Sequence, residues 1–323
     1  MLEDINIKKD LTIIYMGTPE FSSIVLEGLL SKYKVRAVVT NPDRPAGRDG
    51  EIRISKVKEC ANNHLIRVIQ PEKIKTDYEE ILSFEPDLII TCAYGQFIPK
   101  EILDYPRLGC INVHASLLPR LRGGAPIQRA IMEGHTKTGI TIMYMDEKMD
   151  SGDIISQKEI EITEEDTYES LHDKLAVLGR DLLLETLPSI IDGTNTRTKQ
   201  DSIKVTYAPI ITREDERLDF SNNMRQVYNK VRGLYSYPGA YTTLDNKILK
   251  VWKCRETDNN YTGLLNGTIT NIYEDGFGVK VESGEIVITE LQLEGKRRMS
   301  GKEFVNGYQN LKGKMLVWNF SKI

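Results

Sequence analysis

Short apolar runs alternate with longer, partly polar stretches over the first half of the chain. The runs are rich in Val, Ile and Leu, which predicts buried strands, and they lie at 11–16, 35–40, 66–70, 87–94, 109–114 and 139–145. Helical patterns separate several of them, and we expect helices over 18–32, around 73–84 and around 125–134. This alternation predicts an α/β fold with a Rossmann-like, mostly parallel sheet and helices on both faces.

Residues 166–190 form the longest helical pattern. Its apolar side chains recur at spacings of three and four, at Tyr168, Leu171, Leu175, Leu178 and Leu182. This stripe predicts a helix packed on the core. The polar, turn-rich stretch 192–202 follows, so we place the end of the first domain at residue 196 and a linker over 197–212.

The tail of the chain has a different pattern. Short alternating strands are separated by Asp-Asn, Gly and Ser-Gly turns, which predicts a small antiparallel, OB-like β-barrel over 213–323. The net charge of −4 is unevenly spread, because this stretch carries a small excess of Lys and Arg. That excess is compatible with an anionic partner and equally with ordinary surface variation.

Composition narrows the class of protein. At 323 residues, with 40% apolar and 28% charged residues, the chain is typical of a soluble protein with two domains. No apolar run reaches the roughly 18–20 residues of a membrane span, and the start MLEDINIKKD lacks the features of a targeting signal. We therefore expect a cytoplasmic protein. The cysteines form no Cys-x-x-Cys pair and the histidines no His-Glu-x-x-His motif, so we expect no metal site.

Three polar features are expected at the carboxyl ends of the strands, where open α/β sheets bind their ligands. The first is Gly17, but no further glycines complete a Gly-x-Gly-x-x-Gly fingerprint, which disfavours a dinucleotide cofactor. The second is Asn112 and His114, which as residues i and i+2 of a strand point to the same face. The third is the loop 145–155 with its acids Asp146, Asp150 and Asp153.

The pair Asn112 and His114 is open to two interpretations. Both can be polar residues satisfied at a strand end. Alternatively, the amide donates to a developing oxyanion and the imidazole, a common general acid or base, carries a proton. A metal site is disfavoured because asparagine is a poor zinc ligand. One of the three loop aspartates could orient the imidazole, and spacing alone does not say which.

Six further segments accompany this pair. They are MGTPEF (16–21), NPDRPAGR (41–48), AYGQFIP (93–99), GAPIQRA (124–130), YPGAY (237–241) and GKRRM (295–299). Together with Asn112-x-His114, SLLP (116–119) and DSGD (150–153), they resemble the 10-formyltetrahydrofolate-dependent formyltransferases over nearly the whole chain. Within that family, the loop 41–48 and the C-terminal segments resemble the members that formylate a charged tRNA.

The resemblance implies a reaction and the residues that perform it. The formyl group passes from N10 of 10-formyltetrahydrofolate to the α-amino group of the methionine carried by initiator tRNA, and a monomer without a metal is expected. The expected catalytic residues are Asn112, His114 and Asp150. The folate is expected to contact Tyr94, Gly95, Ser116, Leu117, Leu118 and Pro119. The tRNA is expected to contact Arg44, Arg48, Lys296, Arg297 and Arg298.

The chain departs from the pattern of this family in and near the loop 41–54 and at residue 121. Gly50 and Glu51 replace two lysines, Ile54 and Lys56 replace two prolines, and Leu121 replaces an aromatic residue. The catalytic residues are unaffected. The loop neutralises less phosphate charge unless other basic residues compensate, namely Arg53, Lys56 and Lys58.

Two other functions stay open at this point. A formyltransferase acting on an amino sugar nucleotide would share the catalytic residues. A non-catalytic folate-binding or RNA-binding protein would need no such trio. The segments NPDRPAGR and GKRRM favour a tRNA substrate over the sugar nucleotide.

Overall fold

The computed structural model describes residues 11–46 and 51–317. The chain forms two compact units, each with its own sheet. Unit 1 contains residues 1–126, 137–161 and 172–209, and unit 2 contains 127–136, 162–171 and 210–323. The short segments 127–136 and 162–171 were not expected in the second unit. The boundaries at 196 and 212 stay predictions.

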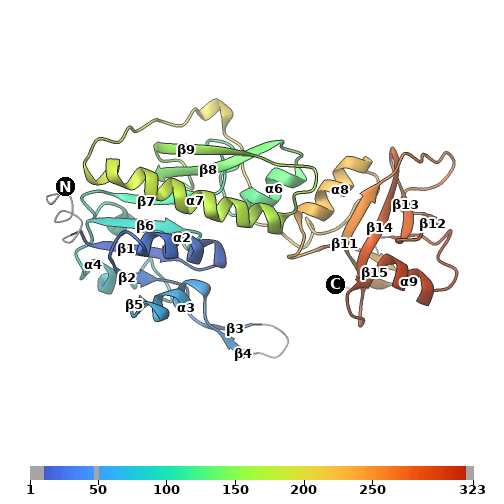
Figure 1. The fold of residues 1–323 in the computed structure, drawn as a ribbon, viewed down its shortest axis with the longest axis horizontal. Coiled ribbons are helices and arrows are strands. Elements are labelled where there is room, and N and C mark those ends of the chain that lie inside the picture. Colours follow the sequence, from blue (N-terminus) through green and yellow to red (C-terminus); the bar gives the residue numbers. More distant parts are fainter. Residues whose placement is uncertain (1–10, 47–50, 318–323) are drawn as a thin grey trace. The chain divides into compact units, whose positions relative to one another are not determined.

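A seven-stranded sheet forms the centre of unit 1 (Figure 1). Across the sheet its strands are β5 (Arg67–Ile69), β2 (Val35–Val39), β1 (Ile13–Gly17), β6 (Leu88–Cys92), β7 (Cys110–His114), β8 (Lys137–Tyr144) and β9 (Ile154–Glu161). The pairs from β5 to β7 are parallel, whereas β8 and β9 run antiparallel to their neighbours. The predicted Rossmann-like, mostly parallel sheet is confirmed.

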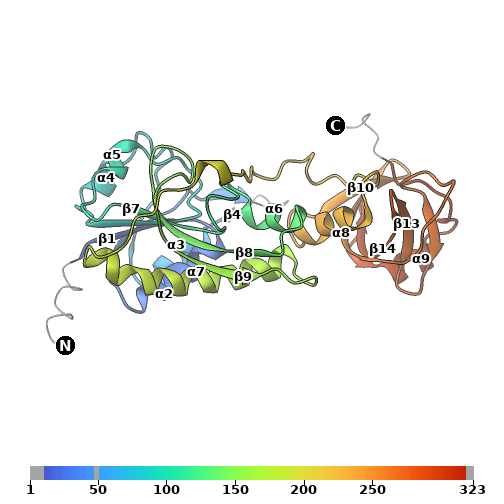
Figure 2. The same cartoon turned by 90° about the horizontal axis from the view of Figure 1, so that it is seen from above.

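Helices cover both faces of this sheet. They are α2 (Glu20–Leu30), α3 (Lys56–Asn63), α4 (Glu79–Leu82), α5 (Lys100–Leu103) and α7 (Tyr168–Ile191). Figure 2 shows α4 and α5 on one side of the sheet and α2 and α7 on the other. On the first side, Ile81 and Ile102 pack with Ile14, Met16 and Ile89 of the strands, and each such side chain contributes roughly 1.5–3 kcal/mol by its burial. Among the helices that the structure describes, none is long and apolar enough to cross a membrane.

Several elements differ from the expectation in extent. The helix predicted over 166–190 is confirmed as α7, but the one predicted around 73–84 is only the single turn α4. The helix predicted around 125–134 is α6 (Pro126–Met132). Strand β9 and the hairpin of β3 (Arg44–Ala46) and β4 (Glu51–Arg53) were not predicted, because they give no apolar run. No side chain of β9 is buried, and those of Arg44, Pro45 and β4 are exposed.

Unit 2 is built on an antiparallel sheet. Its strands are β10 (Ala240–Leu244), β11 (Lys247–Glu256), β14 (Gly284–Leu293), β13 (Phe277–Val281), β12 (Ile269–Ile272) and β15 (Met299–Ser300). At the two-residue turn between β10 and β11, Asp245 and Asn246 both have positive φ, as the predicted Asp-Asn turn requires. The helices α8 (Met224–Gly233) and α9 (Gly301–Gly307) complete the unit. The predicted antiparallel C-terminal part is confirmed.

A buried arginine joins the segment 162–171 to the rest of unit 2. Arg232 of α8 donates hydrogen bonds to the backbone carbonyls of Thr163 at 2.9 Å and Asp166 at 2.8 Å. Its Nε donates to the side chain of Asn229 at 2.9 Å. Burial lowers the pKa of Arg232, but these carbonyls satisfy the guanidinium without a carboxylate partner being required.

Candidate active site

Strand β7 carries the two polar residues that the sequence singles out. It lies between β6 and β8, and its backbone pairs with both neighbours. Asn112 and His114 therefore project from a fixed strand toward the same side. The imidazole of His114 is only 6% exposed, whereas Asn112 is partly exposed. One polar side chain is thus enclosed and the other is accessible to a ligand.

A threonine of the neighbouring strand sets the orientation of the Asn112 amide. The hydroxyl of Thr91, which is buried in β6, donates to Asn112 Oδ1 at 2.8 Å and lies 3.1 Å from the carbonyl of Ile111. The amide nitrogen is therefore the end of the side chain that faces away from Thr91. Among the described residues, this nitrogen has no hydrogen-bond partner, so it is available as a donor to a bound oxygen. Sequence reasoning missed Thr91 because LIITC reads as a core strand.

The imidazole of His114 is held by the backbone. Its Nε2 lies 3.0 Å from the carbonyl oxygen of Leu121. A carbonyl can only accept, so Nε2 carries the hydrogen and Nδ1 is the free ring nitrogen. Nδ1 lies 3.8 Å from Asp150 Oδ1, which is too long for a hydrogen bond but within ion-pair range. The Leu121 carbonyl, rather than Asp150, therefore sets the tautomer.

The loop after β8 presents one of its three acids to the histidine. Asp150 adopts a left-handed backbone with φ of 49°, and its Oδ2 accepts a 2.8 Å hydrogen bond from the backbone N–H of Gly123. Asp146 instead accepts from Ser151 within its own loop, and Asp153 pairs with Arg197 at 3.4 Å. The structure therefore distinguishes the three acids where spacing could not.

The stretch SLLP forms a rigid turn beside the histidine. The hydroxyl of Ser116 donates to the carbonyl of Arg120 at 2.7 Å, and Thr141 and Gln157 engage the backbone N–H and carbonyl of Leu118 at 3.1 and 2.8 Å. These bonds position the Leu121 carbonyl that accepts from His114. Leu117 and Pro119 are the partly exposed members of the stretch, while Ser116 and Leu118 are buried. Their contact with folate stays a prediction.

The segment 197–209 makes hydrogen bonds to the loop that contains Asp150 and to the loop that follows His114. Gln200 accepts two hydrogen bonds from the guanidinium of Arg122, at 3.0 and 2.7 Å, and donates to the carbonyls of Asp150 and Gly152 at 2.8 and 2.9 Å. Arg122 also pairs through its backbone with the chain at 206–208. A segment that reads as a linker thus ties the loop of Asp150 to the loop that follows His114.

Two further residues expected to contact folate lie at the end of β6. The ring of Tyr94 is buried in the core cluster, and burial raises the pKa of its hydroxyl. Its backbone carbonyl accepts hydrogen bonds from Thr18 and Asn41, at 3.1 and 3.0 Å. Gly95 has φ of 89°, a conformation that favours glycine. At this position the hydrogen bonds are made by the backbone carbonyl of Tyr94, while its ring packs in the core.

The basic residues expected to contact tRNA are spread over both units. Arg44 lies in the β3–β4 hairpin and pairs with Glu72 at 3.3 Å, with both side chains 70% exposed. Arg48 lies outside the described residues. Lys58, considered as a compensating charge, is instead held by Asp43 at 2.5 Å and by the side chain of Gln70 at 2.7 Å.

Lys296, Arg297 and Arg298 of unit 2 differ in their exposure and in their ion pairs. Arg297 is exposed and pairs with Glu303 at 2.7 Å. Arg298 pairs with Glu290 and lies over the ring of Trp252 at 4.7 Å. Lys296 is exposed and makes no ion pair with the residues that the structure describes. Lys296 and Arg297 are therefore the more accessible of the three, and Arg298 mainly supports the unit itself.

Comparison with known proteins agrees with this geometry. The family model described as formyl transferase matches residues 9–187, and the model described as formyl transferase, C-terminal domain, matches residues 210–309. The chain therefore belongs to the formyl transferase family.

Curated relatives place the chain within that family. It is 48% identical to the methionyl-tRNA formyltransferase of Bacillus subtilis (strain 168) over 96% of this chain and 99% of the relative. It is also 48% identical to the methionyl-tRNA formyltransferase of Staphylococcus aureus (strain MW2), over 94% and 99% of the two chains. Its own group in the family is thus that of the methionyl-tRNA formyltransferases.

A solved structure supports the fold alone. The N-formyltransferase from Helicobacter canadensis, in complex with folinic acid and dTDP-3-aminofucose, matches with a TM-score of 0.64. The match covers 86% of this chain and 98% of the other at 18% identity. At that identity the likeness extends to the architecture and not to the acceptor substrate.

Proposed function

We propose that this chain transfers the formyl group of 10-formyltetrahydrofolate to the α-amino group of methionine on initiator methionyl-tRNA, for translation initiation. The arrangement of Asn112, His114 and Asp150 is the observation that supports this reaction. An amide nitrogen with no hydrogen-bond partner among the described residues lies on the same strand as an imidazole that faces a carboxylate at 3.8 Å. The acceptor is inferred from the names of the curated relatives. We also propose that the chain acts in the cytoplasm as a monomer.

The residues present suit a formyl donor. A formyl oxygen that gains negative charge needs an N–H donor that no protein group already occupies. The amide nitrogen of Asn112 meets this need, because Thr91 engages only its oxygen. The bound 10-formyltetrahydrofolate would supply the formyl carbon, and Leu117 and Pro119 are the partly exposed residues beside His114 that could contact it.

The amide of Asn112 stabilises the developing oxyanion. Its donor is fixed before the reaction by the hydrogen bond from Thr91, so little reorganisation is required as charge appears. Loss of one such donor typically costs about 10²–10³ in rate. Replacement of Asn112 by Ala should therefore lower turnover far more than affinity for the folate.

The imidazole of His114 transfers the proton. Nε2 keeps its hydrogen on the Leu121 carbonyl, so Nδ1 is the nitrogen that can accept a proton from the attacking amine and return it to the departing nitrogen. The imidazolium formed in this step is stabilised by Asp150 at 3.8 Å. Asp150 is held for this role by the backbone N–H of Gly123.

We propose a catalytic domain over 1–196, a linker over 197–212 and a tRNA-binding domain over 213–323. Arg44, Arg48, Lys296, Arg297 and Arg298 are proposed to contact the tRNA. The exposure of Lys296 and Arg297 supports a role for this end of β14. Contacts to phosphate would make binding weaken steeply as salt concentration rises.

A formylation assay with three acceptors tests the function. The protein is incubated with 10-formyltetrahydrofolate and charged initiator methionyl-tRNA, charged elongator methionyl-tRNA or a dTDP-amino sugar. Formyl transfer to the initiator species should be strongly preferred and should be reduced at least about 100-fold in Asn112→Ala. Transfer to the sugar nucleotide with none to tRNA would instead identify a sugar formyltransferase.

A further inference from the structure

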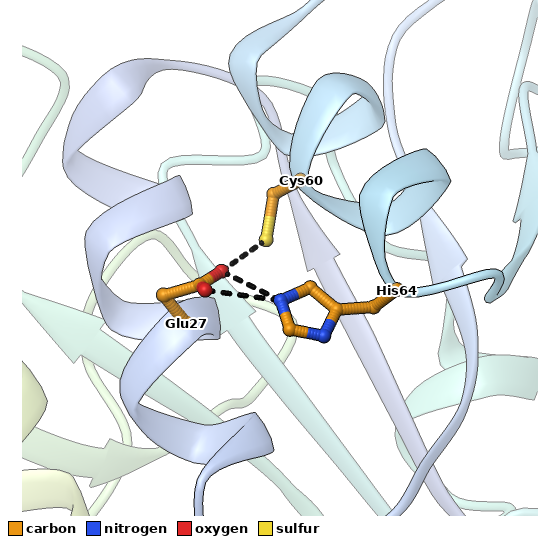
Figure 3. A group of neighbouring side chains, drawn as sticks. All are labelled: Glu27, Cys60 and His64. Carbon is orange, nitrogen blue, oxygen red and sulfur yellow. Dashed lines mark hydrogen bonds and ion pairs between the residues drawn. The ribbon is translucent and has the colours of Figure 1, made fainter.

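Two helices of unit 1 bring together three side chains that the proposed reaction does not use. Figure 3 shows Glu27 of α2 facing Cys60 of α3 and His64, which caps the end of α3. Cys60 and His64 are four residues apart and so lie on the same face of that helix. Sequence reasoning missed this group because its members form no Cys-x-x-Cys or His-Glu-x-x-His motif and Glu27 is distant in the chain.

The three side chains already converge on one point. Cys60 Sγ lies 2.9 Å from Glu27 Oε2, and His64 Nε2 lies 3.0 and 3.1 Å from the two oxygens of the same carboxylate. One ligand atom from each residue, taken together, lies within 4.8 Å of the other two. Because Glu27 donates no proton, the thiol is the donor in its contact with the carboxylate, and the hydrogen of His64 points to the carboxylate as well.

We infer that Glu27, Cys60 and His64 bind one Zn²⁺ ion, with a water molecule in the fourth position. Zinc bonds of about 2.3 Å to sulfur and 2.0–2.2 Å to nitrogen and oxygen require ligand atoms roughly 3.2–3.7 Å apart in a tetrahedron. The distances from the carboxylate oxygens to Cys60 Sγ and His64 Nε2, 2.9–3.1 Å, are slightly shorter than that range, and the sulfur and the nitrogen lie within 4.8 Å of each other. The side chains of Glu27 and His64 are 61% and 41% exposed, so they can rotate without a shift of either helix.

The donor set selects the class of ion. One thiolate, one imidazole and one carboxylate suit Zn²⁺ and its spectroscopic substitute Co²⁺, whereas Mg²⁺ and Ca²⁺ require oxygen ligands. Binding replaces the hydrogen on Cys60 Sγ with a bond to the ion, and the proton leaves to solvent. The ion would join α3 to α2. Since α3 follows directly on the β3–β4 hairpin, it would also anchor that hairpin's C-terminal end.

Titration with Co²⁺ tests the site. The full chain is treated with a chelator under reducing conditions, the chelator is removed, and Co²⁺ is added while the thiolate-to-cobalt absorption band is followed. We expect the band to saturate at one Co²⁺ per chain and to disappear when Zn²⁺ is added. Cys60→Ser should abolish the band, and His64→Gln should weaken binding at least tenfold.

A matched control uses another histidine–carboxylate pair of the chain. His135 lies 3.5 Å from Glu133, and neither neighbour of this pair in the chain is a cysteine, so His135→Gln should bind Co²⁺ like the parent. Zn²⁺ should also raise the melting temperature of the parent but not of His64→Gln, whose exposed position leaves folding intact. No band in the parent at excess Co²⁺, or a band that survives Cys60→Ser, would overturn the inference. The trio would then be a hydrogen-bonded contact between two helices.

Discussion

Replacing Asp150 by Asn removes one negative charge from the proposed site and changes little else. The asparagine side-chain oxygen can still accept the hydrogen bond from the backbone N–H of Gly123. Asparagine also tolerates the left-handed conformation of residue 150, where φ is 49°. The substitution therefore tests the charge that faces His114 without disturbing the backbone of the loop.

The expected cost follows from the distance between the two groups. Two unit charges 3.8 Å apart attract by about 4 kcal/mol at an effective dielectric constant of about 20. Solvent screening is limited, because the side chains of His114 and Asp150 are only 6% and 17% exposed. If the imidazolium forms fully in the transition state, kcat should fall by about 10³-fold, while the KM for the folate should change little.

Single-turnover formylation of charged initiator tRNA at saturating folate measures this effect. Asp153→Asn is the matched control, because Asp153 lies in the same loop but pairs with Arg197. It should retain kcat within about threefold, as expected for an exposed pair. The proposed role of Asp150 would be refuted if Asp150→Asn kept more than about a tenth of the parent kcat, or if Asp153→Asn lost as much.

Three further changes test other parts of the structure. Thr91→Val should lower kcat by about 10–100-fold with little change in KM, because the Asn112 amide loses its orienting hydrogen bond. Thr91→Ser keeps the hydroxyl and should restore kcat. A parallel rise in KM in Thr91→Val would indicate a structural defect instead. Gly123→Ala should destabilise the protein by roughly 1–3 kcal/mol in urea titrations, because φ is 125° and a side-chain carbon would lie 2.6 Å from a backbone oxygen; an unchanged midpoint would contradict this. Burial alone would raise the pKa of the Asp215 carboxyl. Hydrogen bonds from Arg129 and Thr212 outweigh that effect and lower the pKa to about 2. Asp215→Asn should therefore lower the free energy of unfolding by about 2 kcal/mol above pH 4, and the difference should vanish as pH falls toward 2. Tryptophan fluorescence can follow the unfolding, since Trp252 lies in the same unit as Asp215. A difference that persisted at pH 2 would exclude the charge as its cause.

The elements that the sequence predicts well are those whose burial leaves a pattern. The strands β1, β2, β6 and β7 are mostly apolar and mostly buried, and the stripe along α7 has the spacing of a helix packed on a core. The edge strand β9 and the strand β4 leave no such pattern, because none of their side chains is buried. Single-turn helices such as α4 are too short for periodicity to define their ends.

In the candidate site, too, some features could be predicted from the sequence and others could not. Asn112 and His114 were predicted to share a face because the two-residue period of a strand is local. The choice of Asp150 among three acids depends on the path of a loop and on a hydrogen bond from Gly123, which spacing does not encode. The tautomer of His114 depends on a backbone carbonyl, that of Leu121, and backbone atoms carry no sequence signature.

The contacts of Gln200 limit where the N-terminal part of this chain can be cut and fused to a different C-terminal domain. A crossover placed at residue 196, where the catalytic pattern of the sequence ends, would discard the residue that joins Arg122 to the carbonyls of Asp150 and Gly152. A catalytic module that is transferable to another C-terminal appendage must therefore extend through residue 209. The segment that the proposed active site depends on is therefore longer than the sheet that carries Asn112 and His114.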